Sequence, residues 1–206
     1  MHAAVWDYDG TVMDTYPVMV PCLCEALRAR GAEGVDETEM LTLMKDSLSQ
    51  AVSVACARWG LEAEGIYRDF RILERGRMHL MRPVADMPEV LTKLKDEGYR
   101  HFLFTHRDRS ALTGLESCGL LGLFEDAVTS ECAFARKPDP EGLLHLLKTY
   151  GLPADGTWMI GDRPLDVRAG RAAGVRTCLL DPEDRFPKEP CDIRVHDARE
   201  ILLELA

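Results

Sequence analysis

The sequence predicts an α/β fold: a parallel sheet whose strands alternate with helices, with an all-α segment inserted after the first strand. Short apolar runs typical of buried strands alternate with amphipathic helical patterns over most of the chain. Residues 15–82 instead contain helical patterns and no convincing strand. We therefore expect a core domain formed by residues 1–14 and 83–206, and a second, helical domain formed by residues 15–82.

Five apolar runs of similar length predict the strands of the core: Ala3–Trp6, Tyr99–Thr105, Ala127–Thr129, Thr157–Ile160 and Val175–Leu180. Strand and helix patterns alternate between them, which favours right-handed crossovers and a parallel sheet. The stretch Asp181–Pro190 is rich in proline and polar residues, so it is expected to be a loop.

Helices are predicted where apolar residues recur at helical spacing, and four of those in the core are followed by a glycine, a common helix end. The core helices are expected at Pro88–Glu97, Arg109–Cys118, Pro140–Tyr150, Pro164–Ala173 and Ala198–Leu205. The inserted segment is expected to form helices at Tyr16–Arg30, Asp36–Lys45, Ser47–Trp59 and Glu62–Leu80.

Composition narrows the class of protein. The 206 residues carry a formal net charge of −10, which disfavours a nucleic-acid partner. No apolar run approaches the roughly 20 residues needed to cross a membrane, and a strand starting at Ala3 leaves no room for a signal peptide. The seven cysteines are scattered and form no C-x-x-C pair, as is typical of reduced thiols. We expect a cytoplasmic protein, either a monomer or a homodimer.

Polar side chains follow four of the predicted strands at the points where the strands end or soon after. The carboxyl ends of parallel strands meet at one edge of the sheet, where open α/β sheets bind their ligands. The side chains expected at this edge are the carboxylates of Asp7, Asp9, Asp162 and Asp166, the hydroxyl of Thr105 and the amine of Lys137.

This set of groups predicts a metal site beside a phosphate site. Several carboxylates close together repel one another unless a cation or a proton lies among them. Asp7, Asp162 and Asp166 offer hard oxygen ligands, which suit Mg²⁺. Thr105 and Lys137 then offer a hydrogen-bond donor and a positive charge to a phosphate.

Four motifs, in this order, resemble those of the haloacid dehalogenase (HAD) superfamily of phosphatases. They are "DYDGTVMDT" at Asp7, Thr105, Lys137 with Pro138 and Asp139, and "GDRPLD" at Gly161. The resemblance covers nearly the whole chain and implies a Rossmann-like core. The insertion is similar to the helical cap of the phosphoglycolate phosphatase-like and β-phosphoglucomutase-like branch.

The resemblance implies a Mg²⁺-dependent phosphatase that hydrolyses a small phosphate monoester, phosphoglycolate-like or a sugar phosphate, through an aspartyl-phosphate intermediate. Asp7 would attack phosphorus. Asp9 would protonate the leaving alcohol and then take a proton from the attacking water. Mg²⁺ would be bound by the Asp7 side chain, the Asp9 backbone carbonyl and Asp162, with Asp166 acting through water.

The resemblance also implies the phosphate-binding groups. Thr105, the backbone N–H of His106 and Lys137 would neutralise the transferring phosphoryl group. Thr11 would orient Asp9.

Three residues are harder to assign. Arg163 stands where many relatives carry Ser, and it either adds affinity for phosphate or pairs with a neighbouring acid. The side chain of His106 stands where Asn or Ser is frequent. Lys45 in the inserted segment is a candidate for binding a substrate carboxylate or a second phosphate, although a solvated lysine is the simpler interpretation.

Two alternatives to a phosphatase stay open. A phosphomutase of the β-phosphoglucomutase type needs a second phosphate site, for which the insertion offers only Lys45. A non-catalytic binding or regulatory protein on the same scaffold would not need intact Asp7 and Asp9. Dehalogenases lack the second acid, so Asp9 argues against cleavage of a carbon–halogen bond.

Overall fold

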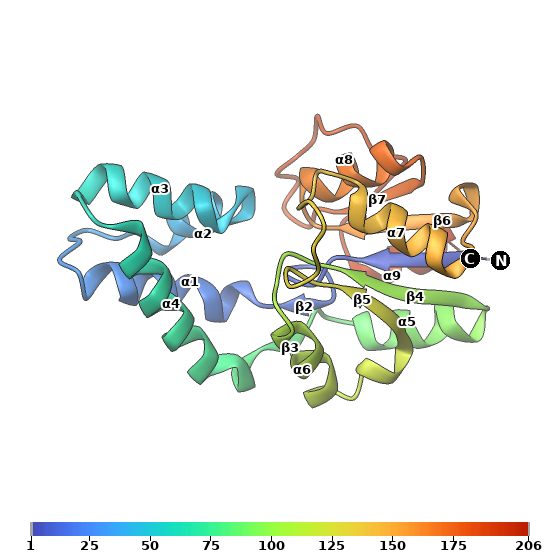
Figure 1. Cartoon of the computed structure of the whole chain (residues 1–206), viewed down its shortest axis with the longest axis horizontal. Coiled ribbons are helices and arrows are strands. Elements are labelled where there is room, and N and C mark those ends of the chain that lie inside the picture. The colour runs from blue at the N-terminus through green and yellow to red at the C-terminus, as the bar shows by residue number, and fades with distance from the viewer. Residues whose placement is uncertain (1, 206) are drawn as a thin grey trace. The chain divides into compact units, whose positions relative to one another are not determined.

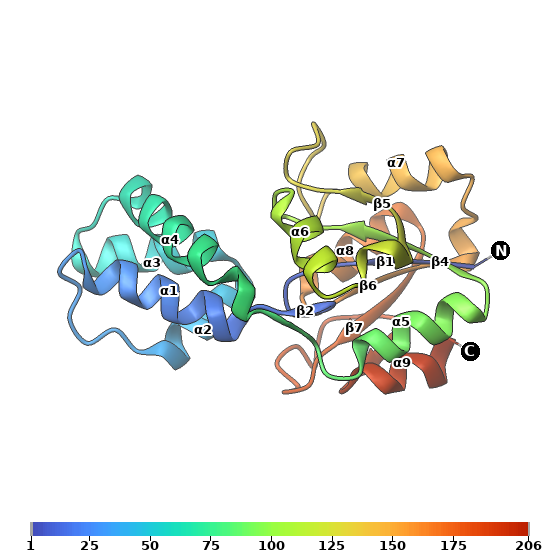
Figure 2. The same ribbon diagram turned by 90° about the horizontal axis from the view of Figure 1, so that it is seen from below.

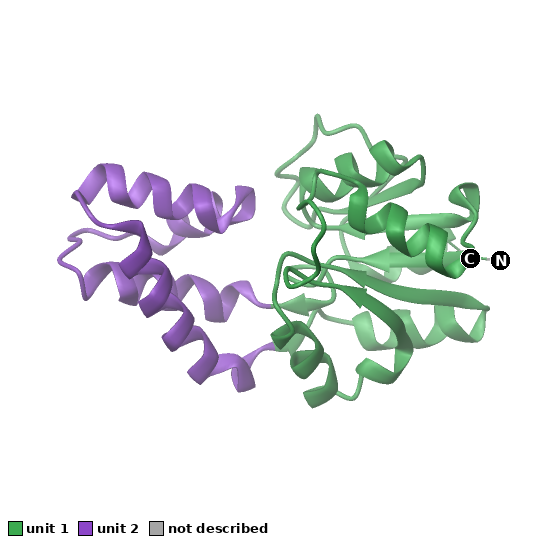
Figure 3. Cartoon of the chain, viewed as in Figure 1, with its two compact units in different colours: residues 1–14, 82–206 green, residues 15–81 purple. Residues whose placement is uncertain are grey.

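A computed structural model describes residues 2–205 and divides the chain into two compact units (Figure 3). The first unit comprises residues 1–14 and 82–206, and the second comprises residues 15–81. Arg82 was expected in the helical segment, but it belongs to the first unit. It pairs with Asp14 in a short antiparallel ribbon formed by β2 (Met13–Asp14) and β3 (Arg82–Pro83).

The first unit is built on a six-stranded sheet in the order β5-β4-β1-β6-β7-β8, and every strand pair in it is parallel. Its strands are β1 (His2–Trp6), β4 (Tyr99–Phe104), β5 (Phe124–Val128), β6 (Thr157–Gly161), β7 (Arg176–Leu180) and β8 (Ile193–Val195). The parallel sheet confirms the predicted α/β, Rossmann-like fold. Trp6, the last residue of β1, lies opposite Leu103 and Ile160, so the chain leaves β1 between two neighbouring strands.

Helices cover both faces of this sheet (Figures 1 and 2). Helices α5 (Met87–Asp96) and α9 (Ala198–Leu205) pack together on one face, and α7 (Glu141–Tyr150) and α8 (Pro164–Ala173) pack together on the other. Helix α6 (Ser110–Ser117) and the 3-10 turns η2 (Leu121–Leu123) and η3 (Ala154–Gly156) complete the unit. Coverage of both faces explains why the central strands are continuous apolar runs.

Three strands were not predicted, and β5 begins three residues earlier than predicted. Strands β2 and β3 have two residues each, too few for an alternating pattern to be recognised. Strand β8 has three residues and lies at one edge of the sheet. Strand β5 lies at the other edge and begins at Phe124. Its start was not predicted because Glu125 and Asp126 are polar and at least partly exposed, so they interrupt the apolar run.

The second unit is helical, with α1 (Tyr16–Arg28), α2 (Glu37–Asp46), α3 (Leu48–Trp59), α4 (Ala63–Arg77) and the 3-10 turn η1 (Met78–Leu80). Helix α1 packs against α2 and α4, and α2 packs against α3. Asp36 and Ser47 begin α2 and α3, where their side chains accept hydrogen bonds from backbone N–H groups. Within residues 2–205, no helix is long and apolar enough to cross a membrane.

Candidate active site

Asp7 is held at the end of β1, in the middle of the sheet edge. Its backbone N–H donates to the carbonyl of Ile160 at 2.8 Å, so the strand pairing fixes its position. Its buried carboxylate accepts from Lys137 Nζ at 2.7 Å and from Arg163 Nη2 at 3.2 Å. Burial alone would raise the pKa of Asp7, but the charges of Lys137 and Arg163 outweigh it and lower the pKa to about 2. Asp7 is therefore ionised at neutral pH.

Lys137 connects two of the acids. Its fully buried Nζ donates to Asp7 Oδ1 at 2.7 Å, to Asp166 Oδ1 at 2.6 Å and to the carbonyl of Phe104 at 2.7 Å. An ammonium group has three donors, so these three acceptors satisfy it completely. Lys137 is thereby held as a hydrogen-bond donor beside the Asp7 carboxylate.

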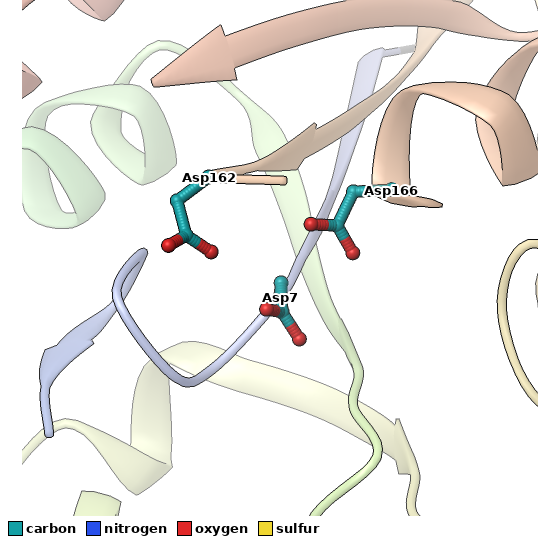
Figure 4. Close-up of side chains that lie close together, drawn as sticks. All are labelled: Asp7, Asp162 and Asp166. Carbon is teal, nitrogen blue, oxygen red and sulfur yellow. The ribbon is translucent and has the colours of Figure 1, made fainter. Parts of the chain in front are cut away.

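Asp162 directly follows β6, and Asp166 lies in the first turn of α8. The carboxylate of Asp166 accepts from the backbone N–H of Arg163 at 3.1 Å, which fixes it in the first turn of α8. Gly161 makes room for it, because a Cβ at Gly161 would collide with the Asp166 carboxyl group. Burial and the charge of Asp7 raise the pKa of Asp166 to about 7. The sequence predicted these acids at this edge, and Figure 4 shows them facing Asp7.

The three acids could hold a metal ion. One carboxylate oxygen from each of Asp7, Asp162 and Asp166 lies within 4.8 Å of the other two, and all three side chains are buried. Two cationic side chains, Lys137 and Arg163, pair with these three carboxylates. The carboxylates therefore outnumber the cationic side chains by one. Oxygen-only donors suit a hard divalent cation. The residues present thus fit the metal site that the sequence predicts.

Asp9 lies two residues beyond Asp7 and is bound by a residue that sequence reasoning missed. Arg107 Nη2 donates to Asp9 Oδ1 at 2.6 Å, and Arg107 Nε donates to Oδ1 at 3.0 Å and to Oδ2 at 3.3 Å. The sequence feature that could have identified Arg107 as a site residue is its position two residues after Thr105. Thr11 was expected to orient Asp9, but its buried hydroxyl makes no hydrogen bond with any residue that the structure describes.

Thr105 and His106 follow β4 at the same edge. Thr105 is buried, and its hydroxyl accepts from the backbone N–H of Arg107 at 3.1 Å. Burial and the neighbouring charge of Lys137 lower the pKa of His106 to about 3, so its ring is neutral at physiological pH. The His106 side chain therefore brings no positive charge to a phosphate.

The two remaining candidates, Arg163 and Lys45, lie in different units of the chain. Arg163 is buried and pairs with Asp7, and its Nε lies 3.7 Å from Asp162 Oδ1. Of the two interpretations of Arg163, pairing with an acid is the one observed. Lys45 lies on α2 in the helical unit, where its Nζ lies 4.2 Å from the centroid of the Tyr16 ring. Its role in binding substrate stays a prediction.

Phosphatases are among the known proteins that this chain resembles. The chain is 28% identical to an N-acetylmuramic acid 6-phosphate phosphatase of Pseudomonas aeruginosa, over 98% of this chain and 93% of the relative. It is also 28% identical to a phosphoglycolate phosphatase of Rhodospirillum rubrum, over 86% of this chain and 78% of the relative. A crystal structure of a predicted phosphoglycolate phosphatase from Haemophilus somnus 129PT shares the fold with a TM-score of 0.89 and 20% identity, covering 100% and 98% of the two chains.

Family membership follows from a match that spans most of the chain. The sequence profile of the haloacid dehalogenase-like hydrolases matches residues 4–180, which run from β1 to the end of β7. This range contains every acid of the cluster together with Lys137. The chain belongs to the haloacid dehalogenase-like hydrolases.

Proposed function

We propose that this protein is a Mg²⁺-dependent phosphatase that hydrolyses a small phosphate monoester through a phosphoryl group carried on Asp7. The observation that carries the proposal is the state of Asp7, which is buried, ionised and held at the sheet edge between two cations. A carboxylate in this setting is a suitable nucleophile for phosphorus, because its charge is retained and its position is fixed. The relatives named above as phosphatases of phosphate monoesters support the same reaction class.

Two steps would complete the reaction. First, the Asp7 carboxylate attacks phosphorus, the ester P–O bond breaks and Asp9 gives its proton to the departing alkoxide. Second, water attacks the aspartyl-phosphate while Asp9 takes a proton from it, which releases inorganic phosphate and regenerates Asp7.

The remaining groups would position and neutralise the phosphoryl group. Lys137 supplies a positive charge beside Asp7, and the Thr105 hydroxyl and the His106 backbone N–H are the proposed hydrogen-bond donors. Asp7, Asp162 and the Asp9 carbonyl are the proposed ligands of Mg²⁺, with Asp166 acting through water. When bound, the ion supplies charge stabilisation for the phosphoryl oxygens.

Substrate choice is assigned to the helical unit, residues 15–81, which we propose is the cap of this family branch. The two phosphatase relatives are named for different esters, which supports a proposal in which the core sets the reaction and the helical unit sets the substrate. Cytoplasmic location and a monomeric or homodimeric state stay predictions.

The test is hydrolysis of 4-nitrophenyl phosphate by the full chain with Mg²⁺, followed by a panel of phosphate monoesters. Asp7→Asn keeps the shape of the side chain and removes the nucleophile, so we expect its rate to fall at least about a thousandfold. Equal rates for the wild type and Asp7→Asn would contradict the proposal. Isomerisation of glucose 1-phosphate without release of phosphate would indicate the phosphomutase instead.

A further inference from the structure

We propose that the side chain of Arg136 binds a second anionic group of the substrate, a carboxylate or a further phosphate, with the ring of His106 beside it. This role rests on the proposed function and specifies its substrate class: a phosphate monoester whose alcohol carries a negative charge of its own. Neither the sequence motifs nor the metal cluster assign a role to Arg136.

Arg136 lies beside the turn that would bind the transferring phosphoryl group. Its Nη2 donates to the backbone carbonyl of His106 at 3.4 Å. The same residue supplies the backbone N–H that is proposed above as a phosphate contact. The two backbone groups of one residue are less than about 4 Å apart. A ligand that reaches from one to the other therefore needs only a short linker between its two anionic groups.

The guanidinium of Arg136 has donors to spare. Acids engage three other cationic side chains at this edge of the sheet: Arg107, Lys137 and Arg163. Arg136 is exposed, and among residues 2–205 it forms no ion pair. An arginine has five N–H donors, and the bond to His106 uses one of them. The others are available to an anion.

The ring of His106 is a second, independent sign of a ligand. Its Nε2 is buried, and no atom within the described part of the chain is hydrogen-bonded to it. A buried polar atom without a partner is costly, so a partner from outside the chain is expected. After burial, the charges of Lys137 and Arg136 are the next causes that lower the pKa of this ring, so it lies near both cations.

The backbone around Arg136 is fixed on both sides. The N–H of Ala135 donates to Glu141 Oε2 at 2.6 Å, and the N–H of Asp139 donates to the carbonyl of Arg136 at 3.0 Å. A group that is held in place before binding loses less freedom when its ligand arrives. Because a guanidinium binds a carboxylate or a phosphate through two nitrogens, an arginine held here would distinguish anionic from neutral substrates.

The experiment measures the binding of three non-hydrolysable phosphonates to the full chain in excess Mg²⁺ by titration calorimetry. Phosphonoacetate carries a carboxylate, phosphonoacetamide has the same shape without that charge, and ethane-1,2-diphosphonate carries a second phosphonate. We expect the wild type to bind one of the two anionic probes at least about tenfold more tightly than phosphonoacetamide. The probe that shows this preference identifies the second group as a carboxylate or a phosphate.

Variants of the proposed site should remove the preference. We expect Arg136→Gln to reduce it to less than about twofold, and Arg136→Lys to retain part of it because the charge remains. His106→Phe keeps a ring but removes its nitrogens, so it should weaken binding of the preferred anionic probe. Because Arg136 is exposed, its replacement should leave the Tm unchanged.

Arg171→Gln is the matched control. Arg171 is also exposed, and its guanidinium also donates to a backbone carbonyl, that of Pro190 at 3.2 Å. It lies in the last turn of α8, whereas the acids of the site lie before and in the first turn. The affinity of Arg171→Gln for each of the three phosphonates should match that of the wild type.

Two results would overturn the proposal. One is a wild type without the preference, which includes a wild type that binds neither anionic probe. The other is a preference that Arg136→Gln keeps within about twofold of the wild-type value; its loss in Lys45→Gln instead would assign the second group to the helical unit. Binding does not require turnover, so failure of the phosphatase proposal is seen separately, as equal rates of 4-nitrophenyl phosphate hydrolysis for Asp7→Asn and the wild type.

Discussion

Lys137 Nζ lies 2.7 Å from Asp7 Oδ1 and 2.6 Å from Asp166 Oδ1, so one ammonium group bridges two acids from different ends of the chain. All three side chains are fully buried. Buried charges persist only when they are paired, because leaving water costs each of them several kcal/mol. The site is therefore a buried charge network whose members depend on one another.

Replacement of Lys137 by Met tests this dependence. Removing one partner of a buried pair leaves uncompensated charge, so we expect the free energy of unfolding to fall by about 3–5 kcal/mol. Lys137 lowers the pKa of both Asp7 and Asp166, so without it both carboxyl groups hold a proton to higher pH in the folded protein, and the deficit should grow as the pH rises from 5 to 8. Urea denaturation at several pH values measures it. The exposed Lys148→Met should stay within about 0.5 kcal/mol of the wild type, and a Lys137→Met protein of wild-type stability would contradict the network.

Replacement of Gly161 by Ala tests the space that Asp166 fills. The new Cβ would collide with the Asp166 carboxyl group, which cannot move without breaking its bonds to Lys137 and to the Arg163 N–H. We expect a loss of about 1–3 kcal/mol in the free energy of unfolding, measured by thermal or urea denaturation. The same change at Gly76, an exposed helical position with open space, should instead stabilise the protein by up to about 1 kcal/mol. Equal effects at the two glycines would show that Asp166 is not confined.

Replacement of Arg163 by Ser tests whether its side chain competes with a metal ion. The guanidinium contacts Asp7 and lies 3.7 Å from Asp162, two of the proposed Mg²⁺ ligands. We expect Arg163→Ser to bind Mg²⁺ about tenfold more tightly by titration calorimetry, equivalent to about 1.4 kcal/mol. Mg²⁺ should also raise the Tm of this variant more than that of the wild type.

Two controls accompany the Mg²⁺ titration. Arg168→Ser changes an exposed arginine of α8, the helix that follows Arg163. Arg168 pairs with Glu189, so the affinity of this variant should match the wild type. Asp162→Asn removes a ligand and should abolish most of the binding. Weaker binding by Arg163→Ser would contradict the competition and would instead indicate that Arg163 supports the site.

The pH dependence of stability tests a buried histidine away from the site. Trp6 Nε1 donates to His101 Nδ1 at 3.0 Å, and His101 Nε2 lies 3.0 Å from the carbonyl of Leu91. This pair of partners selects the neutral tautomer with its proton on Nε2. Burial lowers the pKa of His101 from 6.5 to about 4. Between these values the unfolded chain binds the proton and the folded protein does not, so stability falls by up to about 3 kcal/mol as the pH falls from 6.5 to 4.

His101→Gln isolates this contribution. The glutamine amide still offers an acceptor to Trp6 and a donor to Leu91, but it does not titrate. Urea denaturation between pH 7 and 4.5 should show a shallower loss of stability for the variant than for the wild type. Identical slopes would show that His101 titrates alike in both states.

The main features of the fold could be predicted from local patterns. Helices α8 and α9 begin and end where the sequence predicted, because both show a clear apolar period and α8 begins with a proline and is followed by a glycine. The position of β1 was predicted because apolar side chains fill both faces of a covered parallel sheet. Short strands at the sheet edge, such as β8, were not predicted, because three partly exposed residues are too few to show a strand pattern.

The gathering of Asp7, Asp162 and Asp166 also followed from sequence. Each follows a predicted parallel strand, and parallel strands end at one edge, so topology alone brings the acids near one another. No side-chain direction had to be known for this. The same reasoning placed Lys137 and Thr105 at that edge.

The sequence by itself determined the α/β class, the strand ends and the identity of the acids, because these depend on local periodicity and strand direction. Only the tertiary structure decided the partners: Arg107 on Asp9 across 98 residues, Arg163 on Asp7 across 156, and Trp6 on His101 across 95. Such pairs depend on rotamers and on the packing of segments distant in sequence. Local periodicity in a sequence predicts neither the rotamers nor the packing of distant segments.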